Sequence, residues 1–264
     1  MEMDVKVLKV DDLGRNHIVA EPATVEDLYR HNLIFWTTRF RDELSEEERK
    51  TILDNQENIE TPYTRPATLK LHEVLAEASE KSEFSMLELG AANGTVMKRI
   101  EEKFPKPKLT YVGFECLPLL ADDFKKKFPE HKIHLGDVEE FIGKEKSFFP
   151  EAPFTLFYAT LVFKMIKPDL VRKALRKAAE LTNQFLIYDL LEDTDTELGP
   201  DETLILHMPA RPVFWFVHPW AEYLAEIGFK IVDKQVSKLT EAEAQSPLYD
   251  HQVRGAGYFH AIRE

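Results

Sequence analysis

The sequence predicts an α/β fold: a seven-stranded, mostly parallel sheet with helices on both faces, preceded by a helical cap. Two observations predict it. From Phe84 onwards, short apolar runs alternate with charged amphipathic segments, which is the pattern of βαβ units. Before that point the chain carries polar segments with helical periodicity. We therefore expect an N-terminal helical cap over residues 1–82 and a core over residues 83–264.

The apolar runs of the core are its expected strands, and the charged segments between them are its expected helices. Strands are expected at residues 84–89, 109–114, 133–135, 154–159, 185–190, 229–237 and 257–262. Helices are expected at residues 96–104, 118–128, 138–143, 168–182 and 219–227. Parallel strands need right-handed crossovers, so these helices should cover both faces of one sheet.

The expected cap consists of two helices around a proline-rich segment. Residues 23–40 place apolar side chains close to a period of 3.6, and Thr24 with Asp27 forms a short capping box. Another helix is expected over residues 66–82. Between the two, Pro62 and Pro66 forbid regular helix and favour an extended or turning segment.

The composition limits the function classes. The net charge of -13 disfavours a bulk role on phosphate backbones or anionic membrane surfaces, so neither nucleic acid nor membrane is expected as a partner. The one cysteine, Cys116, allows neither an intramolecular disulfide nor a cysteine-based zinc site, and no metal is expected. No run is long enough to span a membrane, so a soluble cytoplasmic protein is expected. The sequence does not indicate an oligomeric state.

The most informative motif is a glycine-punctuated turn between the first core strand and its helix. The strand ends in Glu88, and Gly90 and Gly94 follow within the string Glu-Leu-Gly-Ala-Ala-Asn-Gly. Glycines let the backbone approach a ligand closely, and the helix start behind them offers free N–H groups. A dinucleotide site would require G-x-G-x-x-G, and an acid before the turn would repel a diphosphate. The acid instead suits a ligand with a positive amino group.

This arrangement resembles motif I of the class I S-adenosylmethionine-dependent methyltransferases, which have a Rossmann-like fold. Later segments resemble that family in the same order. Glu115 ends the second strand, Gly136-Asp137 follows the third, and Gly228-Phe229 opens the sixth. The resemblance covers roughly residues 84–264 and implies S-adenosylmethionine as cofactor. The cofactor-binding residues that it implies are Glu88, Gly90, Ala91, Asn93, Gly94, Glu115, Cys116, Asp137, Val138 and Tyr158, together with Tyr63 and Arg65 from the N-terminal segment.

Several of these residues also fit an ordinary structural role. Glu88 suits a helix cap, Glu115 an exposed strand end, and Asp137 the N-cap of the helix that opens at Val138. Arg65 equally suits a solvated turn. Cys116 has the character of a small, unreactive buried residue.

The acceptor side is less defined by the sequence. An aromatic insertion over about residues 193–218 lies where such enzymes often cover the acceptor, and Arg211 and Trp215 are its candidate substrate-binding residues. His207 and His218 are candidate general bases, although a surface or hydrogen-bonding histidine is the alternative at each. The fourth strand ends in Tyr158-Ala-Thr, without the acid, asparagine or N-P-P motif of many family members, which makes an amine or nucleobase acceptor less expected.

The resemblance therefore implies methyl transfer to a small molecule, most simply to a hydroxyl or carboxylate oxygen. Two alternatives stay open. The first is a protein of the same fold that binds the cofactor without catalysis, because fold does not fix function. The second is a nicotinamide-dependent oxidoreductase, against which the missing G-x-G-x-x-G motif counts.

Overall fold

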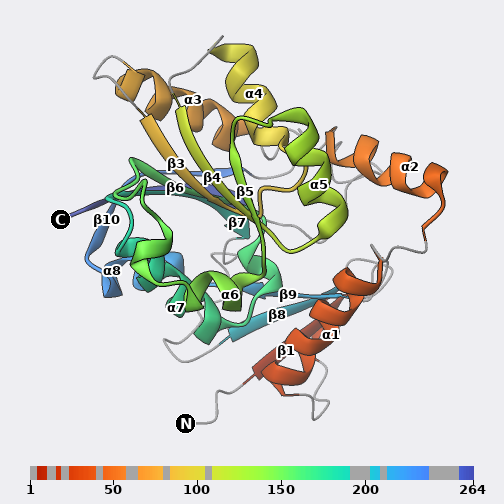
Figure 1. Ribbon diagram of the computed structural model, residues 1–264. Coiled ribbons are helices and arrows are strands. Elements are labelled where there is room, and N and C mark those ends of the chain that lie inside the picture. Colours follow the sequence, from red (N-terminus) through yellow and green to blue (C-terminus); the bar gives the residue numbers. More distant parts are fainter. Residues whose placement is uncertain are drawn as a thin grey trace.

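The computed structural model describes residues 5–10, 16–18, 24–39, 44–57, 65–79, 84–104, 109–190, 203–208, 213–237 and 256–264. Its centre is a seven-stranded sheet in the order β10-β11-β7-β6-β3-β4-β5 (Figure 1). The strands are β3 (Phe84–Leu89), β4 (Leu109–Glu115), β5 (Lys132–Leu135), β6 (Leu156–Thr160), β7 (Gln184–Leu190), β10 (Phe229–Ser237) and β11 (Ala256–Arg263). β11 runs antiparallel to both of its neighbours, β7 and β10, and all other pairs in the sheet are parallel. The predicted mostly parallel sheet is confirmed.

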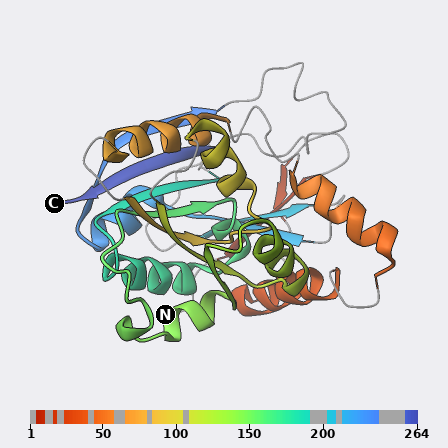
Figure 2. The same ribbon diagram turned by 45° about the horizontal axis from the view of Figure 1, so that its top comes forward.

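Helices cover both faces of this sheet, as Figures 1 and 2 show. One face carries α3 (Arg65–Ser79), α4 (Thr95–Lys103) and α5 (Pro118–Lys127). The other carries α6 (Val138–Gly143), α7 (Pro168–Ala179) and α8 (Trp220–Glu226). Two apolar cores result, because the buried strands present large side chains to both sides. Proline occupies the first position of α5 and of α7, where its fixed φ and missing N–H suit a helix start.

A second, four-stranded sheet was not expected from the sequence. Its order is β2-β1-β8-β9, formed by β1 (Val5–Val10), β2 (Asn16–Ile18), β8 (Thr203–Met208) and β9 (Val213–Val217). The segment before residue 83 contains the helices α1, α2 and α3, and two strands that the sequence analysis did not predict precede them. The expected insertion contains an antiparallel β8–β9 hairpin, and β1 pairs parallel to β8 across about two hundred residues. The N-terminal segment and the insertion thus form one structure.

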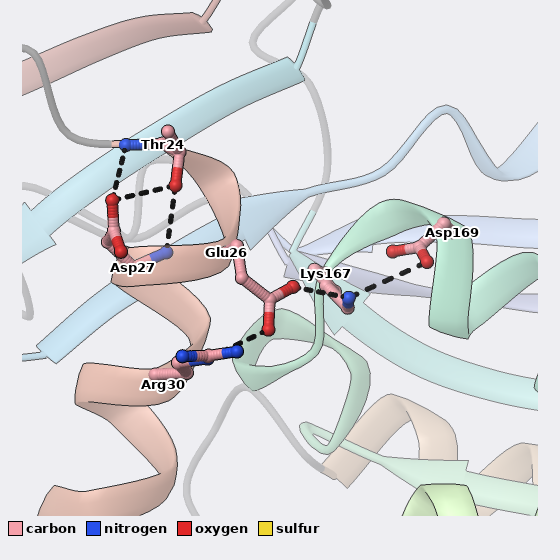
Figure 3. Close-up of polar contacts among 6 residues, drawn as sticks. All are labelled: Thr24, Glu26, Asp27, Arg30, Lys167 and Asp169. Atoms are coloured by element: carbon pink, nitrogen blue, oxygen red, sulfur yellow. Dashed lines mark hydrogen bonds and ion pairs between the residues drawn. The ribbon is translucent and has the colours of Figure 1, made fainter.

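The predicted helix near residue 23 is confirmed as α1 (Val25–Arg39), and it is attached to the core. Thr24 and Asp27 form the expected reciprocal cap at its start (Figure 3). In the same first turn of α1, Glu26 accepts a 2.6 Å hydrogen bond from Lys167, which lies immediately before α7. Deeper in the interface, the buried Asn32 donates to the backbone oxygen of Phe214 and accepts from its N–H, at 2.6 and 2.8 Å. Side-chain hydrogen bonds therefore hold α1 against β9 and α7.

Helix α2 (Glu46–Glu57) lies against the N-terminal part of α5. Ile52 and Leu53 pack on a small apolar cluster that includes Leu117 and Leu120. Among the described residues, no helix combines the length and apolar character needed to cross a membrane.

Candidate functional site

The candidate site lies at the edge of the main sheet where the parallel strands end. There the turn between β3 and α4 adopts left-handed backbone conformations, with φ of 78° at Gly90 and 86° at Gly94. The backbone N–H groups of Gly90 and Ala91 both donate to the carbonyl oxygen of Phe114, at 2.9 and 3.0 Å. The end of β4 therefore fixes the shape of the turn, and the glycine positions serve that shape.

The two glycines are also tightly enclosed. A Cβ at Gly90 would overlap the side chain of Val162, which lies in the loop after β6. A Cβ at Gly94 would overlap the ring of Phe128 at the end of α5. The turn thus runs between two neighbouring segments with no room for a side chain on its glycines.

Glu88 lies beneath this turn rather than on the surface. Its side chain is buried, and Oε2 accepts a hydrogen bond from Tyr111 Oη at 2.5 Å. Tyr158 stands beside Glu88 in the register of β3 and β6, and it is also buried. Burial, together with the charge of Glu115, raises the pKa of Glu88 to about 8. The hydrogen bond from Tyr111 acts in the opposite direction. The carboxyl group is therefore largely protonated at neutral pH unless a positive group approaches it.

Glu115, at the end of β4, is held by the backbone around it. Its two carboxyl oxygens accept from the N–H groups of Ala92 and Leu117, each at 2.9 Å. Burial raises its pKa, while these hydrogen bonds act in the opposite direction. Glu115 is buried, whereas the neighbouring Cys116 is exposed. A carboxylate offers about four lone-pair positions, so both oxygens keep acceptor capacity.

Asp137 is the N-cap of α6, which is the structural role that its position in the sequence allows. Its Oδ1 accepts from the N–H of Glu140, and the Glu140 side chain accepts from the N–H of Asp137, which completes a capping box at the start of α6. The Asp137 side chain stays half-buried at the end of β5, and Val138 is buried in the core. Asp137 can therefore cap α6 through Oδ1 and still contact a ligand through its other carboxylate oxygen.

Asn93 joins the turn to two helices. Its amide nitrogen donates to the backbone oxygen of Leu53 in α2 at 3.4 Å and to Asp123 of α5 at 3.3 Å. Ala92 packs on the same α2–α5 cluster. Helix α2 therefore covers the turn directly, which explains the burial of Asn93.

Asp189 is a site residue that the sequence analysis did not single out. It lies near the end of β7 and is buried. Its carboxyl oxygens accept from the N–H groups of Lys164 at 3.1 Å and Leu190 at 2.7 Å. Burial raises its pKa to about 7, although the backbone donors and the positive charge of Lys164 lower it. The sequence could have indicated Asp189 by its position, because it is an acid near the end of the fifth core strand. Glu88 and Glu115 lie in the same way near the ends of the first and second core strands.

Asp189 thereby fixes the loop after β6, which faces both the turn and the insertion. Within this loop, Val162 contacts Gly90, and Lys164 Nζ lies 4.1 Å from the centre of the Trp215 ring. Trp215 is buried, and its apolar cluster includes Leu161 and Met165 of the same loop. The structure therefore brings the insertion and the candidate cofactor turn to opposite sides of one loop.

The two candidate histidines have different outcomes. His218 is 1% exposed, and its Nε2 lies 2.9 Å from the carbonyl oxygen of Phe163. Burial lowers the pKa of His218 to about 4, which makes it a weak base. The same burial keeps solvent and substrate away from its ring. This arrangement favours the hydrogen-bonding alternative, and we no longer assign His218 as the base. His207 lies on β8 opposite Phe214 of β9, and its side chain is outside the described part.

The remaining candidates lie at the margins of the described structure. Arg65 begins α3 and is exposed. Tyr63 and Arg211 lie outside the described residues.

Comparison with solved structures identifies the fold. No protein-family profile matches the sequence. The magnesium protoporphyrin IX methyltransferase of Synechocystis PCC 6803, solved with bound S-adenosylmethionine, superposes with a TM-score of 0.52 and 9% identity, covering 93% of this chain and 100% of that one. Human N-acetylserotonin methyltransferase, in complex with the same cofactor, gives 0.54 and 14%, covering 91% and 60%. The chain therefore has the fold of the class I S-adenosylmethionine-dependent methyltransferases.

Not every similar structure carries a methyltransferase name. The [4+2]-cyclase SpnF superposes with a TM-score of 0.52 and 12% identity, covering 74% of this chain and 80% of that one. The likeness establishes the fold, and the activity has to be argued from the site.

Proposed function

We propose that this protein is an S-adenosylmethionine-dependent methyltransferase that methylates an oxygen of a small molecule. The observation that carries the proposal is the turn after β3. Left-handed glycines shape the backbone there, and two buried acids, Glu88 and Glu115, lie at the ends of the adjacent strands. The geometry fits a ligand that has both a positive group and a ribose, and it does not fit a diphosphate.

Each part of the turn has a proposed role toward the cofactor. Glu88 balances the charge of the methionine ammonium group, and a positive group at this position favours the ionised carboxylate. Glu115 accepts hydrogen bonds from ribose hydroxyls with the acceptor capacity that Ala92 and Leu117 leave. Asp137 and Val138 border the adenine at the end of β5. These assignments support S-adenosylmethionine as the cofactor.

When bound, this cofactor supplies an electrophilic methyl group on a sulfonium. The chain's own contribution is to align the acceptor with that group and to exclude water. The loop after β6 suits this task, because Val162 lies against the turn while Lys164 and Met165 face the insertion. Helix α2 covers the opposite side of the turn and helps to exclude water there. Its Ile52 and Leu53 pack on the cluster that includes Ala92, and Leu53 accepts a hydrogen bond from Asn93 of the turn.

The proposed acceptor rests on the insertion, the net charge and the end of β6. A small molecule fits because the buried Trp215 packs against Leu161 and Met165 of the loop, and the net negative charge disfavours polyanions. An oxygen fits because the end of β6 lacks the residues typical of amine-methylating relatives. We keep His207 as the candidate base for a hydroxyl acceptor, and Arg211, Trp215, Tyr63 and Arg65 as candidate contacts to the acceptor or the cofactor.

A second function deserves a test because a specific observation favours it. His218 is buried and its pKa is lowered to about 4, so one of the two histidines proposed as a base is unsuited to that role, which favours a non-catalytic cofactor-binding protein. An oxidoreductase remains the less supported alternative, because the turn lacks the glycine spacing of a dinucleotide site.

Methyl transfer itself is tested with a labelled cofactor. The protein is incubated with S-adenosylmethionine labelled on its methyl group and with a panel of phenols, aliphatic alcohols and carboxylic acids. We expect label in an organic-soluble product, and release of labelled methanol by mild base identifies a methyl ester. The variant Glu88→Ala, which removes the proposed ammonium partner, should abolish the transfer. Tight cofactor binding without transfer to any member of a broad panel would instead support the non-catalytic alternative.

A further inference from the structure

Three side chains with metal-ligating groups gather at the edge of the sheet opposite the candidate site. Glu101 lies in the last turn of α4, and Glu130 and His131 lie in the turn that leads from α5 into β5. One potential ligand atom from each lies within 4.8 Å of the other two. The candidate cofactor turn is at the carboxyl ends of the strands, whereas this cluster is at the start of β5. It is therefore a separate location.

His131 is held in a fixed orientation within this cluster. Its backbone N–H donates to the carbonyl oxygen of Phe128 at 3.1 Å, which fixes the turn. Its side chain is 9% exposed, and the ring packs edge-on against Tyr111 with centroids 5.7 Å apart. Nε2 is 3.7 Å from Glu130 Oε1, which is beyond hydrogen-bond distance. No hydrogen bond joins its ring nitrogens to a described residue, so this imidazole, with a side chain nine-tenths buried, keeps a ring nitrogen available beside the two carboxylates.

The two carboxylates add a charge that calls for a cation. Among the described residues, no lysine or arginine forms an ion pair with Glu101 or Glu130. Two like charges this close are unfavourable unless a positive group lies between them. The whole protein is strongly acidic, which raises the local concentration of cations further.

We propose that Glu101, Glu130 and His131 form a binding site for a divalent transition-metal ion, with Zn²⁺ as the preferred occupant. One imidazole and two carboxylates are a ligand set that suits Zn²⁺, whereas Ca²⁺ and Mg²⁺ are bound through oxygen ligands alone. Ligand bonds of about 2.0–2.2 Å require the three atoms to close slightly from their present separation. Three protein ligands leave one tetrahedral position for water.

The site joins two elements that are distant in sequence. It links the end of α4 to the turn before β5, and the His131 ring touches the same Tyr111 that holds Glu88. An ion bound there stabilises the folded chain, because the unfolded chain does not bring these three ligands together. The role is structural and is independent of the proposed methyl transfer.

The test uses the full chain after chelator treatment, without any cofactor. Zn²⁺ is titrated calorimetrically, and Co²⁺ binding is followed by its visible absorption. We expect a site that weakens by about tenfold or more in Glu101→Gln and in His131→Phe, because each variant removes one ligand. His131→Phe preserves a ring against Tyr111. Glu102→Gln, an exposed neighbour on the same helix, is the matched control and should bind as tightly as the unmodified protein.

Two results would overturn the proposal. The first is an absence of Zn²⁺ or Co²⁺ binding. The second is binding that neither Glu101→Gln nor His131→Phe weakens while both variants keep their fold by circular dichroism. Since no cofactor is present, neither result bears on the proposed methyl transfer.

Discussion

At the scale of single residues, burial decides the chemistry of the strand-end acids. Glu88 and Asp189 lie in the protein interior, and burial raises their pKa values to about 8 and about 7. The sequence analysis identified Glu88 because it precedes the glycine turn. It did not predict the partner Tyr111, because that contact depends on the register of β3 with β4. A partner set by strand register cannot be read from local spacing.

Glu88 should make both stability and binding dependent on pH. Its pKa in the folded state is raised, so its contribution is most favourable below about pH 4.5 and is lost as pH rises through about 8. We expect Glu88→Gln to flatten this part of the stability profile, measured by urea denaturation between pH 5 and pH 9. Asp189 contributes to the same window, so the comparison is between the variant and the unmodified protein.

The same carboxyl group gives a proton-linked signature of cofactor binding. Near pH 7, S-adenosylhomocysteine should release protons from Glu88, because its ammonium group favours the ionised carboxylate. Calorimetry in buffers of different ionisation enthalpy measures this release. Binding that retains the same proton release in Glu88→Gln would rule out Glu88 as the ammonium partner.

The glycines of the candidate turn give a prediction about stability. Gly90→Ala combines a left-handed backbone with an overlap against Val162, whereas Gly228→Ala has the same φ of 78° and open space around its Cβ. We expect Gly228→Ala to lower the unfolding free energy by about 1–2 kcal/mol, which is the cost of the left-handed backbone alone. Gly90→Ala should cost clearly more, measured by chemical denaturation. Equal costs would show that Val162 moves aside freely.

At the scale of elements, alternation of apolar and charged segments was sufficient for the main sheet and its helices. The second sheet was not predicted, because β1 and β8 are short strands paired across almost the whole chain. Residues 5–10 do alternate in the manner of a strand, but a lone alternating run does not reveal its partner. The same non-local packing buries His218 beside Phe163, a contact that spacing could not show.

The loop after β6 provides the prediction at this scale. Asp189→Ala leaves the N–H groups of Lys164 and Leu190 without their acceptor. We expect a loss of about 1–3 kcal/mol in unfolding free energy, because the donor of Leu190 is buried and that of Lys164 is partly buried. Asp189→Asn keeps one acceptor oxygen and should lose less. Glu102→Ala, at an exposed acid on α4, is the control and should be close to neutral. A neutral Asp189→Ala would show that the carboxylate does not hold the loop.

At the scale of the whole molecule, the sequence predicts the fold more completely than it predicts the acceptor. The strand order and the antiparallel β11 match the methyltransferase fold, which the ordered motifs also predicted. The acceptor was not predictable, because the proposed acceptor contacts lie in the insertion and the N-terminal segment, which spacing alone does not place. A similar fold also belongs to a [4+2]-cyclase, so methyl transfer has to be measured and cannot be taken from the fold.

Cofactor binding is the most direct test of the central claim. The protein is titrated calorimetrically with S-adenosylmethionine, S-adenosylhomocysteine and NADH, beside the variants Glu88→Ala and Gly90→Val. We predict saturable binding of both adenosyl ligands at one site, no response to NADH, and loss of binding in both variants while circular dichroism shows that they remain folded. Absence of adenosyl binding to the unmodified protein would contradict the account, and saturable NADH binding would favour an oxidoreductase.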